Sequence, residues 1–400
     1  MIAVIACTYI CVYVLIDFIY ALIACVSRRQ FRHKTADIGC SIIVPCGGNE
    51  KAIYKTVSSI LEQNVKKVEI LISCNGVSKE HFLAIKEYIL DKLNETDKVR
   101  FVFGQRANKA RAINQAIQLA VYDVICVVDA DCYFKNHDAL GQLFYNIHGT
   151  TIAAGGRIVA ECPKTLLQKL QQIEYNRSFV LQRIALRSIR SVNLISGAFG
   201  VFRKDIVIAC GGYDETFVGE DMELTMRMQR YCKANRIPYR VEYDPFAVIY
   251  TGVHSSIRKL FRQRDRWQRG LVGSYLKGIS FKNDTSILMR FWARTYMLVY
   301  EILSPYMLVI GMCAVLLDFN VDMVLWLNWI QVLVIYLVGE TAIDLIAELY
   351  RRRLDTSQKD RLSLKSIVLR MPYIIIVEGT VLVAARLLGN VTYLWRKDVW

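Results

Sequence analysis

The stretch Val124-Ile-Cys-Val-Val-Asp-Ala-Asp131 places two carboxylates directly after five apolar, β-prone residues. Two earlier apolar runs, Ser41–Pro45 and Val68–Ser73, have the same character. Helical stretches alternate with these runs, at Lys51–Asn64, Lys79–Leu93 and Ala110–Val121. This alternation predicts an α/β domain from about residue 38 to 250, built from βαβ units on a mostly parallel sheet. Ligands bind at the carboxyl ends of such strands, where Asp129 and Asp131 are expected.

The composition indicates a protein seated at a membrane. The chain has 400 residues, of which 54% are hydrophobic, and a formal net charge of +15. Apolar segments combined with a basic excess favour contact with an anionic cytosolic leaflet. Nucleic-acid binding is not favoured, because the basic residues flank the apolar segments and do not alternate with exposed aromatics. The twelve cysteines include no C-x-x-C pair and no Cys/His cluster, which argues against a zinc site and a disulfide framework.

The N-terminal residues Ile2–Val26 contain one charge, Asp17, and are long enough as a helix to cross a bilayer. No basic segment precedes them and no small-residue cleavage site follows, so a cleaved signal peptide is not expected. Basic residues follow at once: Arg28, Arg29, Arg32 and Lys34. The positive-inside rule then places the N-terminus outside and the next domain in the cytosol.

Three more apolar segments are predicted in the C-terminal third, at Met297–Leu317, Val321–Gly339 and about 367–388. Between the second and third lies a basic link expected in the cytosol, around Arg351, Arg352, Arg353, Lys359, Arg361 and Lys365. The terminal Arg396 and Lys397 favour the cytosol, so the segment around Pro372 either crosses or lies along the interface. Ionisable residues in or near the apolar segments either line a polar interior or snorkel to the surface: Asp17, Glu301, Glu340, Asp344, Glu378 and Arg386.

Two segments have the pattern of amphipathic helices on a membrane surface or packed against the sheet. The first has an apolar stripe at Leu166, Leu170, Ile173, Val180 and Ile184, and basic residues at Arg183, Arg187 and Arg190. The second carries arginines at helical spacing: Arg258, Arg262, Arg266 and Arg269.

The glycine-rich stretch Gly211-Gly-Tyr-Asp-Glu-Thr-Phe-Val-Gly-Glu-Asp221 leads into a predicted helix over Met222–Cys232. Glu220 and Asp221 are suited to capping that helix, where the dipole favours negative charge. They are equally suited to taking a proton from a hydroxyl as a general base. The two interpretations are compatible.

In Gln263-Arg-Asp-Arg-Trp267, Gln263, Arg266 and Trp267 share one helix face. Arg266 is suited to gripping a diphosphate, and Trp267 offers a flat surface to a sugar ring. The pair is also typical of an arginine and tryptophan that anchor a helix at a membrane interface.

The order D-x-D, G-G-Y-D…G-E-D and Q-x-x-R-W, between apolar segments, resembles the processive family-2 membrane glycosyltransferases, such as cellulose, hyaluronan and chitin synthases. The resemblance covers about Ser41 to Gly270. It implies a GT-A-type nucleotide-sugar-binding domain at 38–250, inserted between a transmembrane helix at 1–27 and a transmembrane region at 291–400. Interfacial helices carrying Q-x-x-R-W are expected at 251–290.

The resemblance implies a role for each matching position. Asp221 would be the catalytic base, and Asp131 would hold Mg²⁺ or Mn²⁺. The nucleotide sugar would contact Pro45, Glu50, Asn75, Lys109, Asp129, Asp131 and Arg266. The acceptor would contact Ser196, Gly197, Phe199, Glu220, Gln263 and Trp267.

Two turns depart from the family pattern, both at the nucleobase end. Gly48 stands in a turn that usually carries an aromatic residue, and Asn75 stands where the family has an aspartate. A uridine nucleotide is therefore implied by the resemblance to the family and not by these two turns. The segment Gln171–Tyr175 and the single N-terminal span are most similar to bacterial poly-β-1,6-N-acetylglucosamine synthases, although Gly219 replaces the threonine of their Thr-Glu-Asp motif.

The expected activity is processive, inverting polymerisation of a UDP-sugar, with UDP-GlcNAc favoured, into a β-linked polysaccharide that is extruded across the cell membrane. The expected partners are the growing polysaccharide, the lipid bilayer and a small membrane subunit. The main rival is a non-processive enzyme that adds one sugar to a lipid acceptor. An inactive scaffold or transport subunit is a further alternative.

Overall fold

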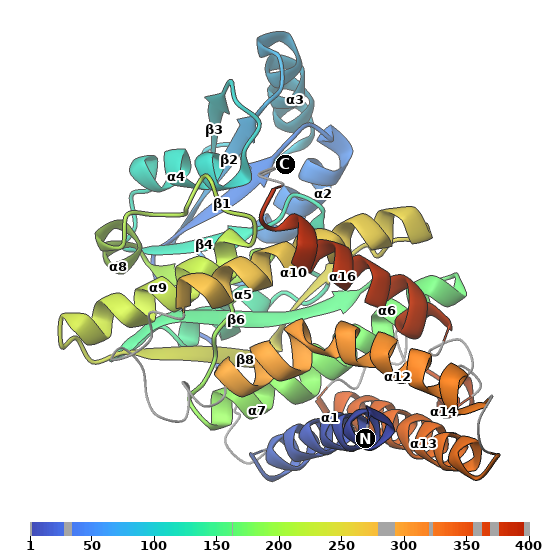
Figure 1. Ribbon diagram of the computed structural model, residues 1–400. Helices are drawn as coiled ribbons and strands as arrows, with labels where there is room; N and C mark the ends of the chain where they lie inside the picture. The colour runs from blue at the N-terminus through green and yellow to red at the C-terminus, as the bar shows by residue number, and fades with distance from the viewer. Residues whose placement is uncertain are drawn as a thin grey trace.

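The computed structural model describes residues 2–27, 34–161, 163–278, 293–319, 323–354, 362–368 and 376–395. A curved sheet with its covering helices forms one part of the molecule, and long apolar helices form a second part beside it (Figure 1). Several residues named above lie outside the described ranges: Arg28, Arg29, Arg32, Lys359, Arg361, Pro372, Arg396 and Lys397.

The sheet has eight strands in the described residues, in the order β3-β2-β1-β4-β7-β6-β8-β5. Their bounds are β1 Cys40–Cys46, β2 Val68–Asn75, β3 Val99–Gly104, β4 Val124–Val128, β5 Cys132–Tyr133, β6 Thr151–Ala160, β7 Phe199–Arg203 and β8 Arg240–Thr251. Strands β1 to β4 pair in parallel, as predicted, and β6 and β8 are also parallel. However, β7 is antiparallel to β4 and β6, and β5 is antiparallel to β8, so the sheet is mixed.

Short polar residues start the helices of the parallel half. These helices are α2 Glu50–Leu61, α3 Lys79–Lys92 and α4 Lys109–Leu119. The side chains of Asn49, Ser78 and Asn108 accept hydrogen bonds from Ala52, His81 and Arg111 N–H, respectively. Such caps satisfy donors that have no partner within a helix, so each strand is followed by a helix with a defined start.

The remaining helices of the part that contains the sheet are α5 Ala139–Tyr145, α6 Leu166–Asn176, η2 Arg177–Gln182, α7 Arg183–Ser188, α8 Lys204–Ala209, α9 Glu220–Ala234 and α10 Ile257–Gly278. A capping box of Thr165 and Gln168 starts α6. The predicted apolar stripe is correct for Leu170, Ile173, Val180 and Ile184, which are buried. It is wrong for Leu166, which is exposed, because Leu167 takes the buried position one residue later.

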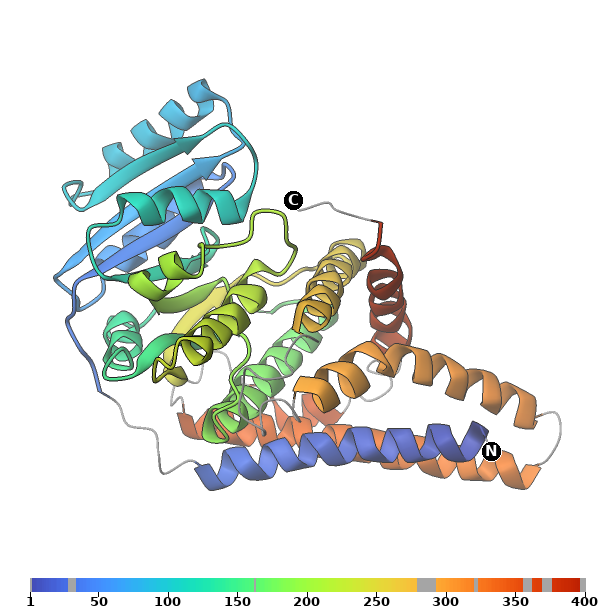
Figure 2. The same cartoon turned by 60° about the vertical axis from the view of Figure 1, so that its left-hand side comes forward.

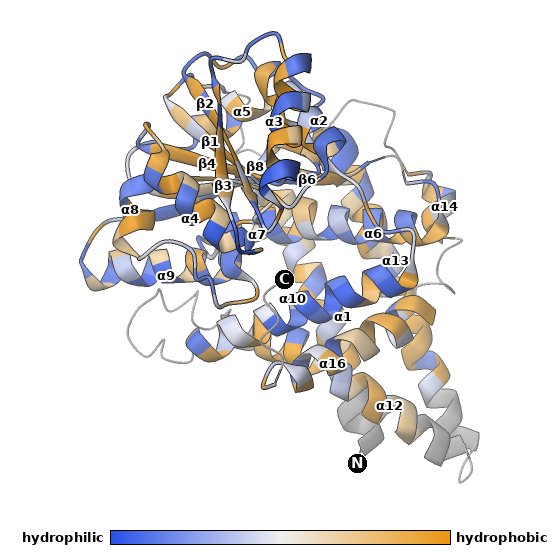
Figure 3. Ribbon diagram, turned by 90° about the horizontal axis from the view of Figure 1, so that it is seen from above, coloured by the Kyte–Doolittle hydropathy of each residue, from blue (hydrophilic) through white to orange (hydrophobic). Residues whose placement is uncertain are grey.

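The apolar part consists of α1 Ile2–Val26, η3 Ala293–Ile302, α12 Ser304–Phe319, α13 Met323–Leu354, α14 Leu364–Val368, η4 Val377–Leu382 and α16 Val383–Thr392. In the described residues, two helical stretches are long and apolar enough to cross a membrane, Thr8–Val26 and Trp329–Leu354. Figure 2 shows α1 and α13 side by side, with α12 next to them and α16 directed away from them, beside α10. Figure 3 shows the strands of the sheet and α12 mainly in apolar colour.

The C-terminal segments differ in part from the predicted ones. The break between η3 and α12 falls at Leu303, beside Pro305. The second segment is longer than predicted, because α13 continues through Arg353 to Leu354. The third segment, as far as the structure describes it, packs on α10: a Cβ built on Gly389 would lie 2.7 Å from the Gln268 Cβ.

Candidate active site

The carboxyl end of β4 brings Asp129 next to Lys109, the first residue of α4. The Lys109 ammonium forms an ion pair with Asp129 and donates a hydrogen bond to the Gly197 carbonyl oxygen at 3.4 Å. The Asp129 N–H donates to the Ala198 carbonyl oxygen at 3.2 Å. Strand β4 and the loop before β7 are thus joined at the point where Asp129 and Asp131 leave the sheet.

Charge accumulates around this ion pair. Burial opposes the charge on Lys109, but Asp129, Glu220 and Asp221 outweigh it and raise the pKa of the ammonium. Burial raises the pKa of the Asp129 carboxyl, although Lys109 opposes that shift. Burial likewise raises the pKa of Glu220, against the pull of Lys109. One ammonium therefore faces several carboxylates, an arrangement that suits a site where charge changes during a reaction.

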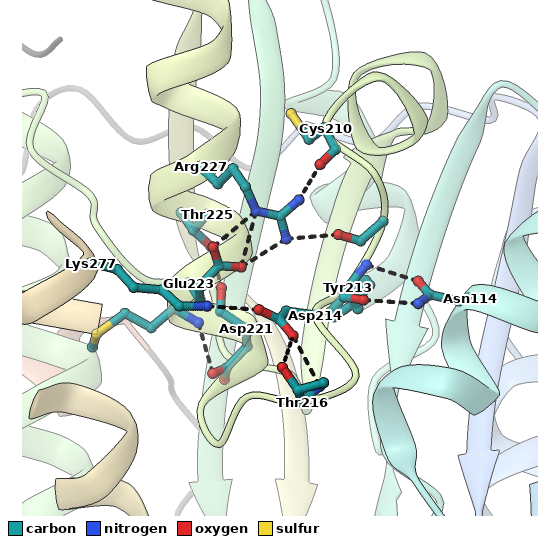
Figure 4. Close-up of polar contacts among 12 residues, drawn as sticks. Asn114, Cys210, Tyr213, Asp214, Thr216, Asp221, Glu223, Thr225, Arg227 and Lys277 are labelled. Carbon is teal, nitrogen blue, oxygen red and sulfur yellow. Dashed lines mark hydrogen bonds and ion pairs between the residues drawn. The ribbon is translucent and has the colours of Figure 1, made fainter. Parts of the chain in front are cut away.

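The loop that ends at Asp221 is held from several sides (Figure 4). Asn114 of α4 exchanges hydrogen bonds with the backbone of Tyr213, at 2.8 Å each. Arg227 donates to the Gly212 carbonyl oxygen at 2.8 Å, and Asp214 pairs with Lys277 of α10 at 2.7 Å. The loop therefore has a fixed position relative to α4, α9 and α10.

Helix α9 begins at Glu220, two residues earlier than predicted, with Gly219 as its N-cap at φ +87°. No side chain caps this end, so Glu220 and Asp221 are first-turn residues and not caps. The Asp221 carboxylate accepts hydrogen bonds from the Gly197 N–H at 2.9 Å and the Met222 N–H at 2.8 Å. These two bonds fix the carboxylate next to the Ser196–Gly197 turn.

Helix α10 packs directly against this loop. A Cβ built on Gly270 would lie 2.7 Å from the Val218 carbonyl oxygen and 2.9 Å from the Gly219 Cα. Two glycines thus allow the backbones to touch. Six residues earlier in α10, buried Arg264 pairs with Glu174 of α6 and places its guanidinium 4.2 Å from the ring centroid of Trp267. One face of the Trp267 ring is therefore covered, and the residue is 45% exposed.

One cavity of about 840 Å³ collects most of the predicted site residues. It is lined by Lys109, Asp129, Asp131, Ser196, Gly197, Glu220, Asp221, Gln263, Arg266 and Trp267. Seven of these residues come from three sequence motifs that are up to about 140 residues apart, and Lys109 of α4 and the Ser196–Gly197 turn complete the set. The cavity continues between the apolar helices, where it reaches Tyr13, Tyr300, Tyr336 and Trp329.

Four predicted site residues are not among those that line this cavity. Pro45 is buried in β1, and Glu50 starts α2, where its carboxylate is 3.9 Å from His81. Asn75 is 5% exposed at the end of β2, and among the described residues neither end of its amide has a hydrogen-bond partner. Phe199 is fully buried in β7, with its ring centroid 5.2 Å from that of Phe134.

The sequence analysis did not assign roles to His254, Glu174 and Arg177, which also line the cavity. His254 follows β8, and Gln171 holds its backbone through hydrogen bonds of 3.1 and 2.7 Å. Burial lowers the pKa of its imidazole, as do Arg264, Lys259 and Arg266, while Asp131 opposes the shift. Glu174 and Arg177 lie in the predicted amphipathic helix, where a charged residue among buried positions was the available signal.

The carboxylates that line the cavity determine whether a divalent cation can bind there. In the described ranges, no three His, Cys, Asp or Glu side chains converge to hold a metal. Asp131 and Asp129 nevertheless present carboxylates to the cavity, and Mg²⁺ binds through one or two carboxylates when substrate phosphates supply further oxygens. The residues fit a metal that binds together with a diphosphate.

Two curated relatives match more than half of the chain. A poly-β-1,6-N-acetyl-D-glucosamine synthase of Staphylococcus aureus (strain COL) is 28% identical over 235 residues, which cover 58% of this chain and 54% of the relative. A synthase of the same name from Staphylococcus epidermidis is 26% identical over 244 residues, with the same coverage. The chain thus spans about half the length of these curated relatives.

The fold also matches a solved structure. The mannosyltransferase PcManGT from Pyrobaculum calidifontis, in complex with GDP-Man and Mn²⁺, aligns with a TM-score of 0.68 and 16% sequence identity, over 99% of both chains. This confirms the GT-A-like fold. The family model described as glycosyltransferase-like family 2 matches residues 38–270, which is more than half of the chain. The protein therefore belongs to glycosyltransferase family 2.

Proposed function

We propose that this protein is a processive, inverting glycosyltransferase that transfers a sugar, with UDP-GlcNAc favoured, onto a growing β-linked polysaccharide. The relatives named poly-β-1,6-N-acetyl-D-glucosamine synthase support this choice of sugar. The catalytic domain would face the cytosol, and the apolar helices α1, α12 and α13 would lie in the cell membrane, where α1 and α13 are long enough to cross it. A small membrane subunit would complete the path of the product.

One observation carries the proposal: a single cavity joins the carboxylates of the site to the space between the apolar helices. A chain bound at Trp267 could continue from there past Tyr13, Tyr300 and Tyr336 without leaving the cavity. Aromatic rings and polar groups suit the alternating faces of a sugar chain. An enzyme that releases its product after each transfer does not require such a continuation.

Each of these residues would have its own role in the reaction. Asp221 takes the proton from the acceptor hydroxyl, whose oxygen attacks the anomeric carbon from the face opposite the nucleotide. The bond between that carbon and the diphosphate oxygen breaks, and the nucleoside diphosphate leaves with the electron pair. Lys109 and Arg266 stabilise the negative charge of the leaving group. Gln263 and Trp267 hold the acceptor, with Glu220 close to its hydroxyls.

A divalent cation, Mg²⁺ or Mn²⁺, would bind at Asp131 with help from Asp129, and when bound it would neutralise the diphosphate. The Mn²⁺ in the PcManGT complex supports this class of cofactor. Lys109 already compensates Asp129, so the Asp131 carboxylate is the more available ligand.

The nucleobase would bind at the ends of β1 and β2, near Pro45, Glu50 and Asn75. The buried and unpartnered amide of Asn75 supports this position, because it can both donate and accept a hydrogen bond. The Asn75 side chain is buried, so it would have to turn outward to contact a base. Phe199 would act on the acceptor only through the Ser196–Gly197 turn that precedes it.

The test uses purified protein in lipid nanodiscs with Mg²⁺ or Mn²⁺ and a panel of nucleotide sugars. Release of nucleoside diphosphate and the size of the product are measured together. Release with UDP-GlcNAc and a product of high mass is expected. A short glycolipid as the sole product would favour the rival that modifies a lipid acceptor, and release with a different donor would correct the sugar.

The variant Asp221→Asn separates an enzyme from an inactive scaffold. We expect loss of diphosphate release by roughly two to four orders of magnitude, because an amide cannot take the proton. Asp205→Asn is the matched control, since its carboxylate is exposed and pairs with Arg203 on the surface. Equal rates for both variants would contradict the role of Asp221.

A further inference from the structure

Arg264 lies inside the Q-x-x-R-W segment of α10, at a position for which the sequence predicts no role. Its side chain is 3% exposed, and it nevertheless borders the cavity. It contacts the side chains of Glu174, Gln263 and Trp267, which line the same cavity. Arg264 therefore joins α6 to the acceptor side of the site.

The guanidinium of Arg264 is anchored from outside α10. Its Nη2 donates a hydrogen bond to the Oε2 of Glu174, which is 90 positions earlier in the chain. A buried arginine that pairs with a carboxylate adds little net stability, because both groups lose hydration. The plane of the guanidinium does gain a fixed orientation, since Glu174 holds one end of it. The pair is therefore better suited to orienting its neighbours than to stabilising the fold.

Two side chains of the acceptor wall depend on that orientation. The Arg264 Nη1 donates a hydrogen bond to the Gln263 Oε1 at 3.1 Å. With this end of the amide engaged, the N–H donors of Gln263 remain for the oxygens of a sugar. The guanidinium also lies 4.2 Å from the centroid of the Trp267 ring. This contact covers one face of a side chain that is 45% exposed and leaves the other face for stacking.

We infer that Arg264 is a positioning residue for the acceptor, and that its pair with Glu174 holds Gln263 and Trp267 in the orientation that binds a sugar ring. Without the guanidinium, the indole could adopt other rotamers, and a bound sugar would have to restrict them, which lowers its affinity. Lysine cannot replace arginine, because its ammonium does not lie flat on a ring and does not donate in a planar fork. The inference rests on the proposed function, since it takes the acceptor to be a sugar chain at Trp267.

Equilibrium binding tests the inference without requiring turnover. Isothermal titration calorimetry on the nanodisc protein measures the affinity for a β-linked N-acetylglucosamine hexasaccharide and, separately, for UDP with Mg²⁺. We expect Arg264→Met to weaken hexasaccharide binding about tenfold and to change UDP binding by less than about twofold, because the contacts that it removes are those of the acceptor wall. Arg264→Lys should keep the Tm of the wild type and still weaken hexasaccharide binding by about fivefold or more.

A double variant separates positioning from a structural role. In a Trp267→Ala background, Arg264→Met should weaken hexasaccharide binding by less than about threefold, because the ring that Arg264 orients is gone. Arg187→Met is the control, since Arg187 pairs with Glu242 at 2.6 Å and does not line the cavity, and it should change neither affinity.

Four results would each overturn the inference: unchanged hexasaccharide binding in Arg264→Met, full recovery in Arg264→Lys, additive losses in the double variant, or no hexasaccharide binding by the wild type. Diphosphate release from the nucleotide-sugar panel reports separately on the proposed function, so that the failure of one is distinguishable from the failure of the other.

Discussion

At the scale of single residues, Lys109 connects the motif that would hold the diphosphate to the motif that would hold the base. Lys109 forms an ion pair with Asp129, and its positive charge also offsets part of the negative charge of Glu220 and Asp221. We expect Lys109→Met to lower kcat/KM for the nucleotide sugar by roughly 10²-fold, because the leaving group loses a fixed cation. Steady-state diphosphate release measures this, and Lys98→Met, which removes a surface pair with Glu95, is the control. A wild-type kcat/KM in Lys109→Met would mean that Lys109 only balances Asp129.

Asp214 gives a prediction about pH. Burial alone would raise the pKa of its carboxyl, but hydrogen bonds from Lys277 and Thr216 outweigh burial and lower the pKa to about 2. A carboxyl with a lowered folded-state pKa stabilises the fold above its unfolded pKa of about 4 and loses that contribution as the pH falls towards 2. Asp214→Asn should therefore lower Tm at pH 7 by about one degree, with about 1 kcal/mol as the upper limit for this partly exposed pair.

Thermal unfolding of the wild type and Asp214→Asn is compared at several pH values. The difference in Tm should be constant from pH 7 to 5 and shrink between pH 4 and 2. A difference that persists at the lowest pH would assign the effect to packing of the loop and not to the charge of Asp214.

At the scale of elements, the contact of α10 with the catalytic loop sets the position of Asp221 relative to Trp267. Gly270→Ala places a Cβ 2.7 Å from the Val218 carbonyl oxygen, so the loop must move by several tenths of an ångström. We expect kcat to fall by roughly tenfold or more while the nucleotide affinity changes little, because misplacement of reacting groups is costly. Ser274→Ala, one turn along α10, removes an unpartnered buried hydroxyl and should leave kcat unchanged. If Gly270→Ala had normal kcat, the contact would not position the base.

Local patterns predicted the parallel half of the fold well. The strand predicted at Val124–Val128 has those bounds, and the helices at Lys79–Leu93 and Ala110–Val121 are correct within two residues, because the apolar strands and the caps Ser78 and Asn108 are local signals. Strand β7 was missed, since its antiparallel pairing with β4 depends on contacts between residues 71 to 79 positions apart along the chain. The three motifs identified seven cavity residues, and the family resemblance added Lys109, Ser196 and Gly197. The position of Arg177 could not be predicted, because its partners Asp17 and Glu340 lie on other helices.

At the scale of the whole molecule, Arg177 joins the catalytic part to the apolar helices. It follows α6, whose Glu174 lines the cavity, and its guanidinium lies between Asp17 of α1 and Glu340 of α13. Tyr300 of η3 donates a hydrogen bond to the same Asp17 at 2.6 Å. Four elements therefore converge on one buried cluster. Loss of the Arg177 guanidinium would leave the carboxylates of Asp17, Glu340 and Asp344 without the cation that they share. Removing one partner of a buried ion pair costs roughly 3–5 kcal/mol.

We therefore expect Arg177→Met to separate two activities. The nucleotide half, β1 to β4 with its helices, does not depend on Arg177, so donor binding should remain close to that of the wild type. The acceptor path should lose its alignment with Asp221, and the polymer product should become shorter while diphosphate release continues through transfer to water. Arg187→Met is the matched control, because Arg187 pairs with Glu242 inside the catalytic part at 2.6 Å. Nucleotide titration and product sizing in nanodiscs measure both effects. Full-length product from Arg177→Met would show that the two parts stay aligned without this cluster, and that α10 with α16 is sufficient to join them.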